Sequence, residues 1–203
     1  MGLIASDKSG KGFDPVAEGV HNAVCFWLYD LGTHLDEKFG KRNHSCLIGW
    51  EIPGERIEIE KDGVKQNLPR AISKKYTISL NEKANLRKDL QTWRGRVFTE
   101  KELEGFDIKN LLGKSCMIQV IHNKKGDKTY ANIAAIMPLM KGVAPLTPEK
   151  PLKFYSIQDD RDQIPEGTPE WVRDIIKTSD EWQAFGPTEE AAGNTPVNDV
   201  PNF

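Results

Sequence analysis

Lysine and arginine side chains gather in three places along the chain, each with an aromatic side chain beside them. Lys and Arg neutralise phosphates, and an aromatic ring can stack on a base for about 1–3 kcal/mol per base. This chemistry suits single-stranded nucleic acid. The candidate contacts are Lys38, Phe39, Lys41, Arg42, Arg70, Lys74, Lys75, Tyr76, Lys124, Lys125, Lys128 and Tyr130.

Each of these groups also has a plainer interpretation, because lysine-rich loops are often only solvated turns. Two other aromatic positions favour the core. Trp50 shares a strand face with Ile48 and Ile52, so we expect it to be buried rather than to stack on a base. The segment 93–98 (WRGRVF) is basic and aromatic too, but its spacing indicates buried rings with arginines at a helix end.

Charge divides the chain into a basic body and an acidic C-terminal segment. From Ser156 onward there are eleven acidic and three basic residues, a formal charge of −8. The rest holds 25 basic and 19 acidic residues, a formal charge of +6. A basic body suits a polyanion, and an acidic tail can repel or mimic one.

Enzymatic motifs are missing from the sequence: it has no Gly-rich phosphate loop, CxxC pair, HExxH or GxSxG. Cys25, Cys46 and Cys116 each fall in an apolar run without metal-ligand spacing, so we expect core packing, no metal and no cofactor. An odd number of widely spaced cysteines indicates reduced thiols in a cytoplasm-like compartment. No apolar run approaches the ~20 residues of a membrane span, and we expect no membrane association.

Alternating residues predict five strands, at 20–31, 45–52, 75–80, 115–122 and 128–137. A polar loop is expected over 32–44, a turn at 53–54 and a short hairpin over 56–66. Helical spacing follows the third strand over 85–93, with Asn81 as its cap and Gly95 at its end. Thr99 opens a second short helix with a capping box, residues 107–112 form one more helical turn, and Pro169 opens a helix near the C-terminus.

This order predicts a mainly β protein with some α: a five-stranded oligonucleotide-binding (OB) barrel with a helix between its third and fourth strands. We expect a flexible N-terminal arm over residues 1–18, the barrel over 19–140, a linker and accessory helix over 141–185, and a disordered acidic tail over 186–203. In such a barrel the three basic groups would converge on one side.

Four stretches resemble a group of phage proteins described as OB-fold proteins that bind single-stranded DNA or act in replication. They are YDLGT (29–33), SKKYTISL (73–80), LRKDLQTWRGRVFTEKELEGFDIKNLLGK (86–114) and IHNKKGDKTYANIAAIMPL (121–139). The likeness covers about residues 13–140, with a weaker echo in PEWVRDIIKTSDEW (169–182). It implies a phage-encoded protein that acts in the cytoplasm of a bacterial host.

The C-terminal tip is similar to that of bacterial single-stranded-DNA-binding proteins, which close with Asp, Ile, Pro and Phe after several acids. Here Asp199, Val200, Pro201 and Phe203 follow that order, with Asn202 inserted and only one acid in the tip. The likeness implies a contact with replication or recombination proteins. A tail without a partner is the alternative.

Together these features predict a non-enzymatic single-stranded-DNA-binding protein that supports DNA replication or recombination. One rival is an OB-like interaction module that binds or inhibits a host or phage protein. Another is a nuclease that uses scattered carboxylates. The sequence leaves open the oligomeric state, a homo-oligomer included, and the preference for DNA or RNA.

Overall fold

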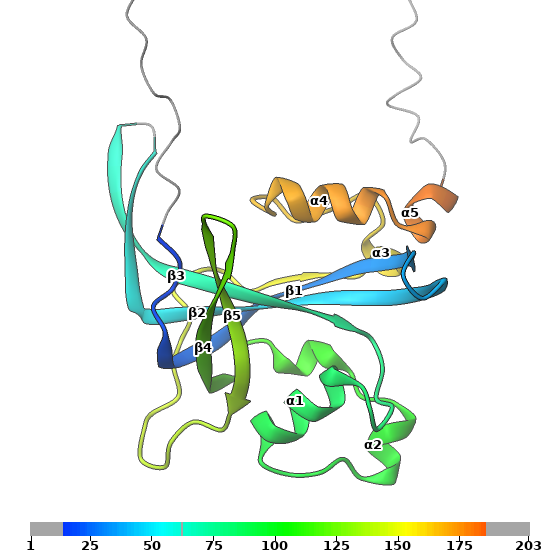
Figure 1. Cartoon of the computed structure of the whole chain (residues 1–203), viewed down its shortest axis with the longest axis horizontal. Helices are drawn as coiled ribbons and strands as arrows, with labels where there is room; N and C mark the ends of the chain where they lie inside the picture. The colour runs from blue at the N-terminus through cyan, green and yellow to red at the C-terminus, as the bar shows by residue number, and fades with distance from the viewer. Residues whose placement is uncertain (1–13, 62, 186–203) are drawn as a thin grey trace, which may run out of the picture.

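The computed structural model describes residues 14–61 and 63–185 and is mainly β. Five strands form one curled antiparallel sheet in the order β3-β2-β1-β4-β5, and a short sixth strand pairs with β1 in parallel (Figure 1). The arrangement is compatible with an OB-like fold. The strands are β1 (Gly19–Asp36), β2 (Lys41–Lys61), β3 (Val64–Thr77), β4 (Ser115–Lys125), β5 (Lys128–Met137) and β6 (Lys153–Tyr155).

The helices fall into two groups along the chain. The first group follows β3 and the second follows β6, and they lie on opposite sides of the β1–β2 ribbon (Figure 1). Their bounds are α1 (Asn85–Arg94), α2 (Glu100–Glu104), the 3₁₀ helix η1 (Ile108–Leu111), α3 (Ile157–Asp160), α4 (Glu170–Lys177) and α5 (Asp180–Ala184). No helix of the described chain is long and apolar enough to cross a membrane.

The predicted polar loop over 32–44 is wrong. β1 and β2 continue through it as a hairpin in which Asp36 pairs with Lys41. Thr33 donates its backbone N–H to Glu181, and the ring of His34 contacts the carbonyl oxygen of Ile175. These partners come from the far end of the chain, so no local pattern of apolar residues marks the two strand ends.

The predicted turn at Pro53-Gly54 is also wrong. β2 passes through it with a shift of register between Ile52 and Arg56, then continues to Lys61, which pairs with Val64. Proline lacks a backbone N–H, so an irregular position in a ladder accommodates it. The third strand therefore begins eleven residues earlier than predicted, at Val64, and ends at Thr77 instead of Leu80.

The helix after β3 begins later than its predicted cap. The N-cap is Ala84, whereas Asn81 accepts the backbone N–H of Lys83 in the preceding turn. Gly95 ends α1 as expected, with a φ of +67° that favours glycine. The capping box of α2 is confirmed: Thr99 accepts the backbone N–H of Glu102, and the Glu102 carboxylate accepts that of Thr99.

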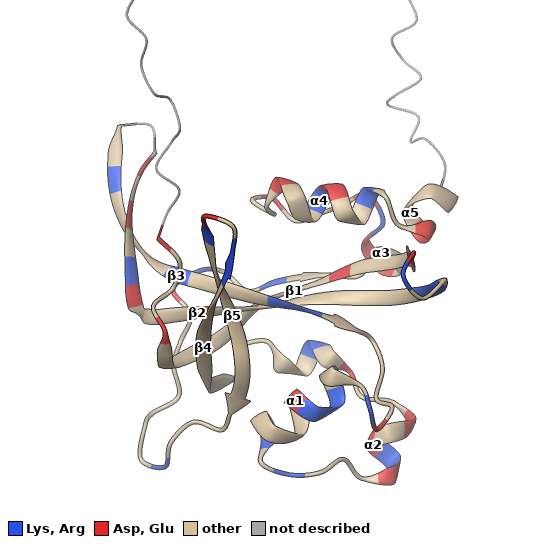
Figure 2. Ribbon diagram, viewed as in Figure 1, with Lys and Arg blue, Asp and Glu red and all other residues tan. Residues whose placement is uncertain are grey.

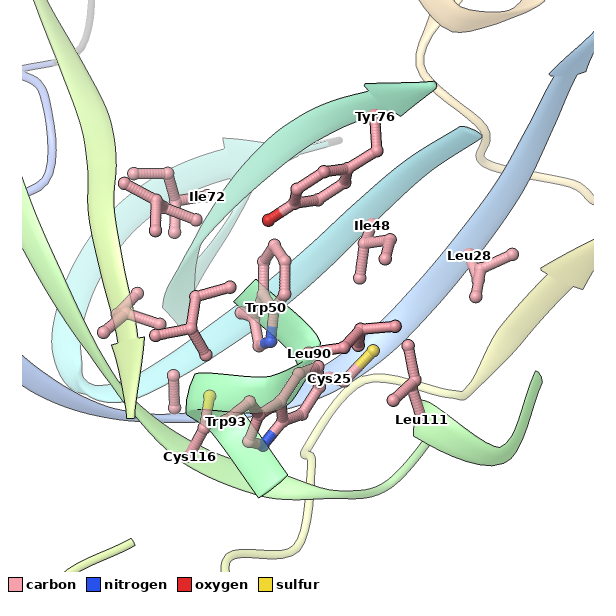
Figure 3. Packing of buried hydrophobic residues seen from close by; sticks show 14 of the residues in the cluster. Cys25, Leu28, Ile48, Trp50, Ile72, Tyr76, Leu90, Trp93, Leu111 and Cys116 are labelled. Atoms are coloured by element: carbon pink, nitrogen blue, oxygen red, sulfur yellow. The ribbon is translucent and has the colours of Figure 1, made fainter. Parts of the chain in front are cut away.

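The first hydrophobic core lies between the sheet and α1 (Figure 3). Trp50 and Trp93 meet there with ring centroids 5.8 Å apart, which confirms that both rings are buried. Cys25, Cys46 and Cys116 are fully buried in the same core, as expected. Burial raises the pKa of Cys25 and Cys46 to about 12 and also raises that of Cys116, so all three remain protonated at neutral pH.

A second core covers the other face of β1. Tyr29 and Leu31 of β1 pack against Val172 and Ile176 of α4 and against Tyr155 of β6. The accessory helix is thus present at Glu170–Lys177, but the segment expected as a linker also supplies β6, α3 and α5. We call residues 153–185 the C-terminal cap. Elements of three to five residues are too short to show a period in the sequence.

The N-terminal segment joins the body of the protein earlier than predicted. Residues 1–13 of the expected arm lie outside the described chain. Val16 is buried in the first core, its carbonyl oxygen contacts the ring of His122, and Glu18 accepts the backbone N–H of His122. Residues 14–18 are therefore part of the packed structure.

Candidate nucleic-acid interface

The first basic group lies on the β1–β2 hairpin. The side chains of Lys38, Phe39 and Lys41 are exposed, and the Phe39 ring is 66% accessible, as a stacking role would require. The Lys38 ammonium lies 5.3 Å from the centre of that ring. Arg42 is also on this hairpin, but on strand β2 instead of in a loop.

The C-terminal cap places two acidic residues on this hairpin. Arg42 donates two hydrogen bonds to Asp180, the one from Nε at 2.6 Å, and these bonds lower the pKa of that carboxyl group. Glu181 accepts the backbone N–H and the hydroxyl of Thr33 at 2.7 and 2.6 Å. Burial raises the pKa of Glu181, but these hydrogen bonds outweigh it and the pKa is lowered.

The cap fits the hairpin closely. Gly32 has a φ of +74°, and a Cβ there would lie 2.4 Å from the Cβ of the buried Ser179. The His44 ring meets Asp30 at 2.6 Å and Glu181 at 3.9 Å. The hydrogen bond with Asp30 raises the pKa of His44. The hairpin and the first residues of α5 therefore form one charged network.

The second basic group lies on β3 and consists of Arg70, Lys74, Lys75 and Tyr76. Its side chains are divided between the two faces of the strand, because successive side chains of a strand point in opposite directions. Lys74 donates to Asp89 of α1 at 2.7 Å, and the Tyr76 hydroxyl donates to the same oxygen at 2.7 Å. Tyr76 is only 3% accessible and lies in the first core (Figure 3). The proposal that Tyr76 stacks on a base is therefore wrong, since neither face of its ring is open.

Lys75 points the other way and is exposed. It lines two adjoining hollows of about 600 and 230 Å³, which share Ser45, Lys75 and Thr77. The smaller hollow extends to residues 34–36 of the β1–β2 hairpin, and the larger to residues 79–84 and the first residue of α1, Asn85. Lys75 is thus the member of its group that can reach a ligand beside that hairpin.

The third basic group keeps the exposure that was predicted. Lys124, Lys125 and Lys128 lie on the β4–β5 hairpin, and none has a carboxylate within ion-pair distance among the residues that the structure describes. Tyr130 follows on β5 and is 48% accessible. In the ribbon of Figure 2, positions of basic residues are coloured on both strands of this hairpin.

A hollow of about 500 Å³ separates β3 from β5, and Arg70 lies on its β3 wall. Tyr130 lines this hollow as well, so the fold brings these two predicted residues together. Lys150 also lines it, although the sequence placed Lys150 in a linker. Its position depends on Glu51, a fully buried carboxylate that accepts the backbone N–H groups of Glu149 and Lys150 at 2.8 and 3.0 Å.

The three groups do not converge on one surface. The β1–β2 turn lies at one end of the long ribbon beside α5, and the β4–β5 hairpin crosses the sheet away from it (Figures 1 and 2). The basic residues therefore form two separate regions. One holds Lys38, Lys41, Arg42 and Lys75, and the other holds Arg70, Lys124, Lys125 and Lys128.

The proposed partner-binding tip, Asp199, Val200, Pro201 and Phe203, lies outside the described residues. Within residues 14–61 and 63–185, no group of three His, Cys, Asp or Glu side chains is placed to hold a metal ion. Comparison with protein-family models, curated proteins and solved structures finds no match to this chain.

Proposed function

We propose that the protein binds single-stranded DNA, without turnover, at the β4–β5 hairpin. The observation that carries this proposal is that Lys124, Lys125 and Lys128 are exposed and free of described carboxylate partners, with the accessible ring of Tyr130 on the same hairpin. Unpaired cations attract phosphates, and an accessible ring offers a face to an unpaired base. Duplex DNA hides its bases, so we propose a preference for single strands.

We further propose that the curled sheet is an OB-like barrel left open between β3 and β5. Its strand order places β1 between the β2–β3 and β4–β5 pairs, and α1 follows β3 in the chain. OB folds characteristically bind oligonucleotides along their sheet and loops. This likeness supports the proposal by analogy, whereas the free lysines support it by chemistry.

The resemblance to phage proteins suggests the setting: DNA replication or recombination in the cytoplasm of an infected bacterium. There the tip at Asp199–Phe203 would recruit replication or recombination proteins. Deletion of Phe203 should then remove specific partners from pull-downs of infected cells. Recovery of the same partners with and without Phe203 would refute recruitment through the tip and leave DNA binding untouched.

A salt titration tests DNA binding most directly. Affinity for a labelled oligo(dT) should fall steeply with salt, and the logarithm of the association constant loses about 0.7 per phosphate contact for each log unit of salt. The variant Lys124→Gln/Lys125→Gln/Lys128→Gln should lower the slope by about 2. Its matched control is Lys88→Gln/Lys101→Gln/Lys141→Gln, which removes three exposed lysines elsewhere and should leave the slope unchanged.

Three results would contradict the proposal. Equal slopes for the two triple variants would place the contacts elsewhere. Equal affinity for duplex and single-stranded oligonucleotides would remove the role of the bases. Metal-dependent cleavage of labelled DNA would show a nuclease.

An interaction module is the second candidate, and the open strand edges favour it. β3 and β5 are the outer strands of the described path, so each has one edge without a neighbouring strand. Such edges can accept an added strand from another polypeptide through backbone hydrogen bonds. Binding of that kind depends little on salt and would survive the lysine substitutions, which separates it from DNA binding.

A further inference from the structure

The gap between β3 and β5 forms a hollow that is open to solvent. Residues 69–73 of β3 and 129–131 of β5 form its two walls, and its volume is about 500 Å³. Further along the seam, Lys74 donates to the carbonyl oxygen of Ile133 at 3.3 Å and ties the strands together. Small-molecule sites in proteins usually measure about 300–1,000 Å³, so the hollow has the size of a ligand site.

Two cations line this hollow without a carboxylate partner in the described chain. Lys150 donates to the carbonyl oxygen of Pro69 at 2.7 Å. Arg70 donates to the carbonyl oxygens of Asp14 and Arg56. Hydrogen bonds to neutral carbonyls fix both groups in place, and Glu51 and Glu149 act on the Lys150 charge only from beyond ion-pair distance. Burial lowers the pKa of Lys150, which is the expected cost of holding an ammonium group in this position.

The remaining walls are aromatic and apolar. Tyr130 contributes a half-accessible ring, and Val16, Ile72 and Ala131 contribute apolar surface. Asp14 is the one acidic residue among those that line the hollow. A ligand that fits needs a flat apolar part for the ring and an anionic part for the two cations. A nucleotide has both, with its base and its phosphate.

We propose that this hollow holds one nucleotide of the bound strand, with its base on Tyr130 and its phosphate against Lys150 and Arg70. The inference rests on the proposed DNA binding and gives it a defined subsite. The neighbouring Lys124, Lys125 and Lys128 hold the phosphates outside the hollow. The strand therefore enters along the β4–β5 hairpin and places one base between β3 and β5.

Photo-crosslinking of the full chain tests this placement. Oligo(dT) that carries 5-iodouracil is bound at low salt, irradiated and digested, and the crosslinked residue is identified by mass spectrometry. We expect the crosslink at Tyr130. The Tyr130→Ala variant should lose it and bind about 5- to 150-fold more weakly, which is the fold-change of about 1–3 kcal/mol for one stacked base. Tyr130→Phe keeps the ring and should bind as the unaltered protein does.

Charge variants test the phosphate contact. Lys150→Gln should reduce the salt slope by about 0.7, and Asp14→Asn should raise affinity at low salt because it removes the acid from the lining. The hydrogen bond to the Glu51 carboxylate comes from the backbone N–H of Lys150, so the change to glutamine leaves it in place. Melting temperatures confirm that each variant is folded, and Lys88→Gln is the control for the loss of one exposed lysine.

The outcomes separate the subsite from the function. DNA binding with crosslinks elsewhere on the β4–β5 hairpin, and full affinity in Tyr130→Ala, overturns the subsite and leaves the proposed function standing. No binding of single strands at any salt concentration overturns both. If the protein binds an acidic peptide instead of DNA, and Tyr130→Ala loses that binding, the proposal that a nucleotide occupies the hollow is wrong. The hollow then binds a polypeptide.

Discussion

The β1–β2 and β4–β5 hairpins carry the same kinds of side chain in opposite electrostatic settings. Each presents three basic residues and an accessible aromatic ring. On the β1–β2 hairpin, Asp30, Asp36 and Glu37 balance the three bases, and α5 adds two more acids. On the β4–β5 hairpin the turn residue Asp127 is the single acid.

The difference teaches that a basic segment of sequence does not by itself make a positive surface. Asp180 and Glu181 are about 140 residues away from the hairpin that they neutralise, and only the docking of the cap brings them there. Surface ion pairs contribute little to stability, but they cancel the field that would attract a phosphate. Within the described chain, the acids of α5 therefore act on the β1–β2 region and not on the β4–β5 hairpin.

The largest expected effect on DNA affinity comes from reversing charge on the β4–β5 hairpin. Lys124→Glu/Lys125→Glu should weaken binding of single-stranded DNA by about 100-fold at low salt, because it replaces two phosphate contacts with repulsion. Lys38→Glu/Lys41→Glu makes the same change of charge on the neutralised hairpin and should cost less than about 5-fold. Fluorescence anisotropy measures both. A larger loss from the second variant would reverse the assignment of the two hairpins.

A smaller effect is expected from unmasking the neutralised hairpin. Asp180→Asn/Glu181→Gln should raise affinity for single-stranded DNA by about 3- to 10-fold at low salt, since it frees Arg42 and removes two acids beside it. The gain should vanish in high salt, where exposed charges are screened. Glu170→Gln/Asp174→Asn removes two exposed acids of α4 and is the matched control. An equal gain in the control would mean that net charge, not the contact, governs binding.

Local signals predicted some parts of this molecule well. The capping box at Thr99, the glycine that ends α1 and strand β5 all depend on neighbouring residues, and each appears where expected. The burial of Trp50 followed from its place among apolar residues on one strand face. Such features are set within a few residues, so the sequence displays them directly.

Features that depend on distant partners escaped prediction. The ends of β1 and β2 are polar because the cap supplies their contacts, and β6 is too short to show a period. Its position beside Lys74 and Lys75 predicted that Tyr76 binds DNA. The Tyr76 hydroxyl instead donates a hydrogen bond to Asp89 of α1, and the ring is buried. Lys150 reaches the hollow only through the buried Glu51, and an acid inside an apolar strand was the one available signal.

His44 should report the contact between the cap and the β1–β2 hairpin through pH. Asp30 raises the pKa of His44, so the contribution of protonated His44 to stability is complete below its unfolded value of about 6.5. That contribution is lost as pH rises through the folded pKa. The difference in unfolding free energy between the protein and His44→Gln should therefore be present at pH 5 and absent at pH 9. The same difference at both pH values would show that the charge of His44 is irrelevant.

The smallest expected effect belongs to Phe39, the aromatic residue of the neutralised hairpin. Phe39→Ala should change stability by less than about 0.5 kcal/mol, because the ring is 66% accessible and its removal leaves no cavity. It should weaken DNA binding by less than about 2-fold in the full chain, since phosphates are kept from this hairpin. In the Asp180→Asn/Glu181→Gln background the same change should cost about 5-fold or more, as a stacked base would. The double-mutant cycle thus measures the coupling between the ring and the acids of α5. A 5-fold loss in the unaltered background would show that the β1–β2 hairpin binds DNA with the cap docked, and the contrast between the two hairpins would then be wrong.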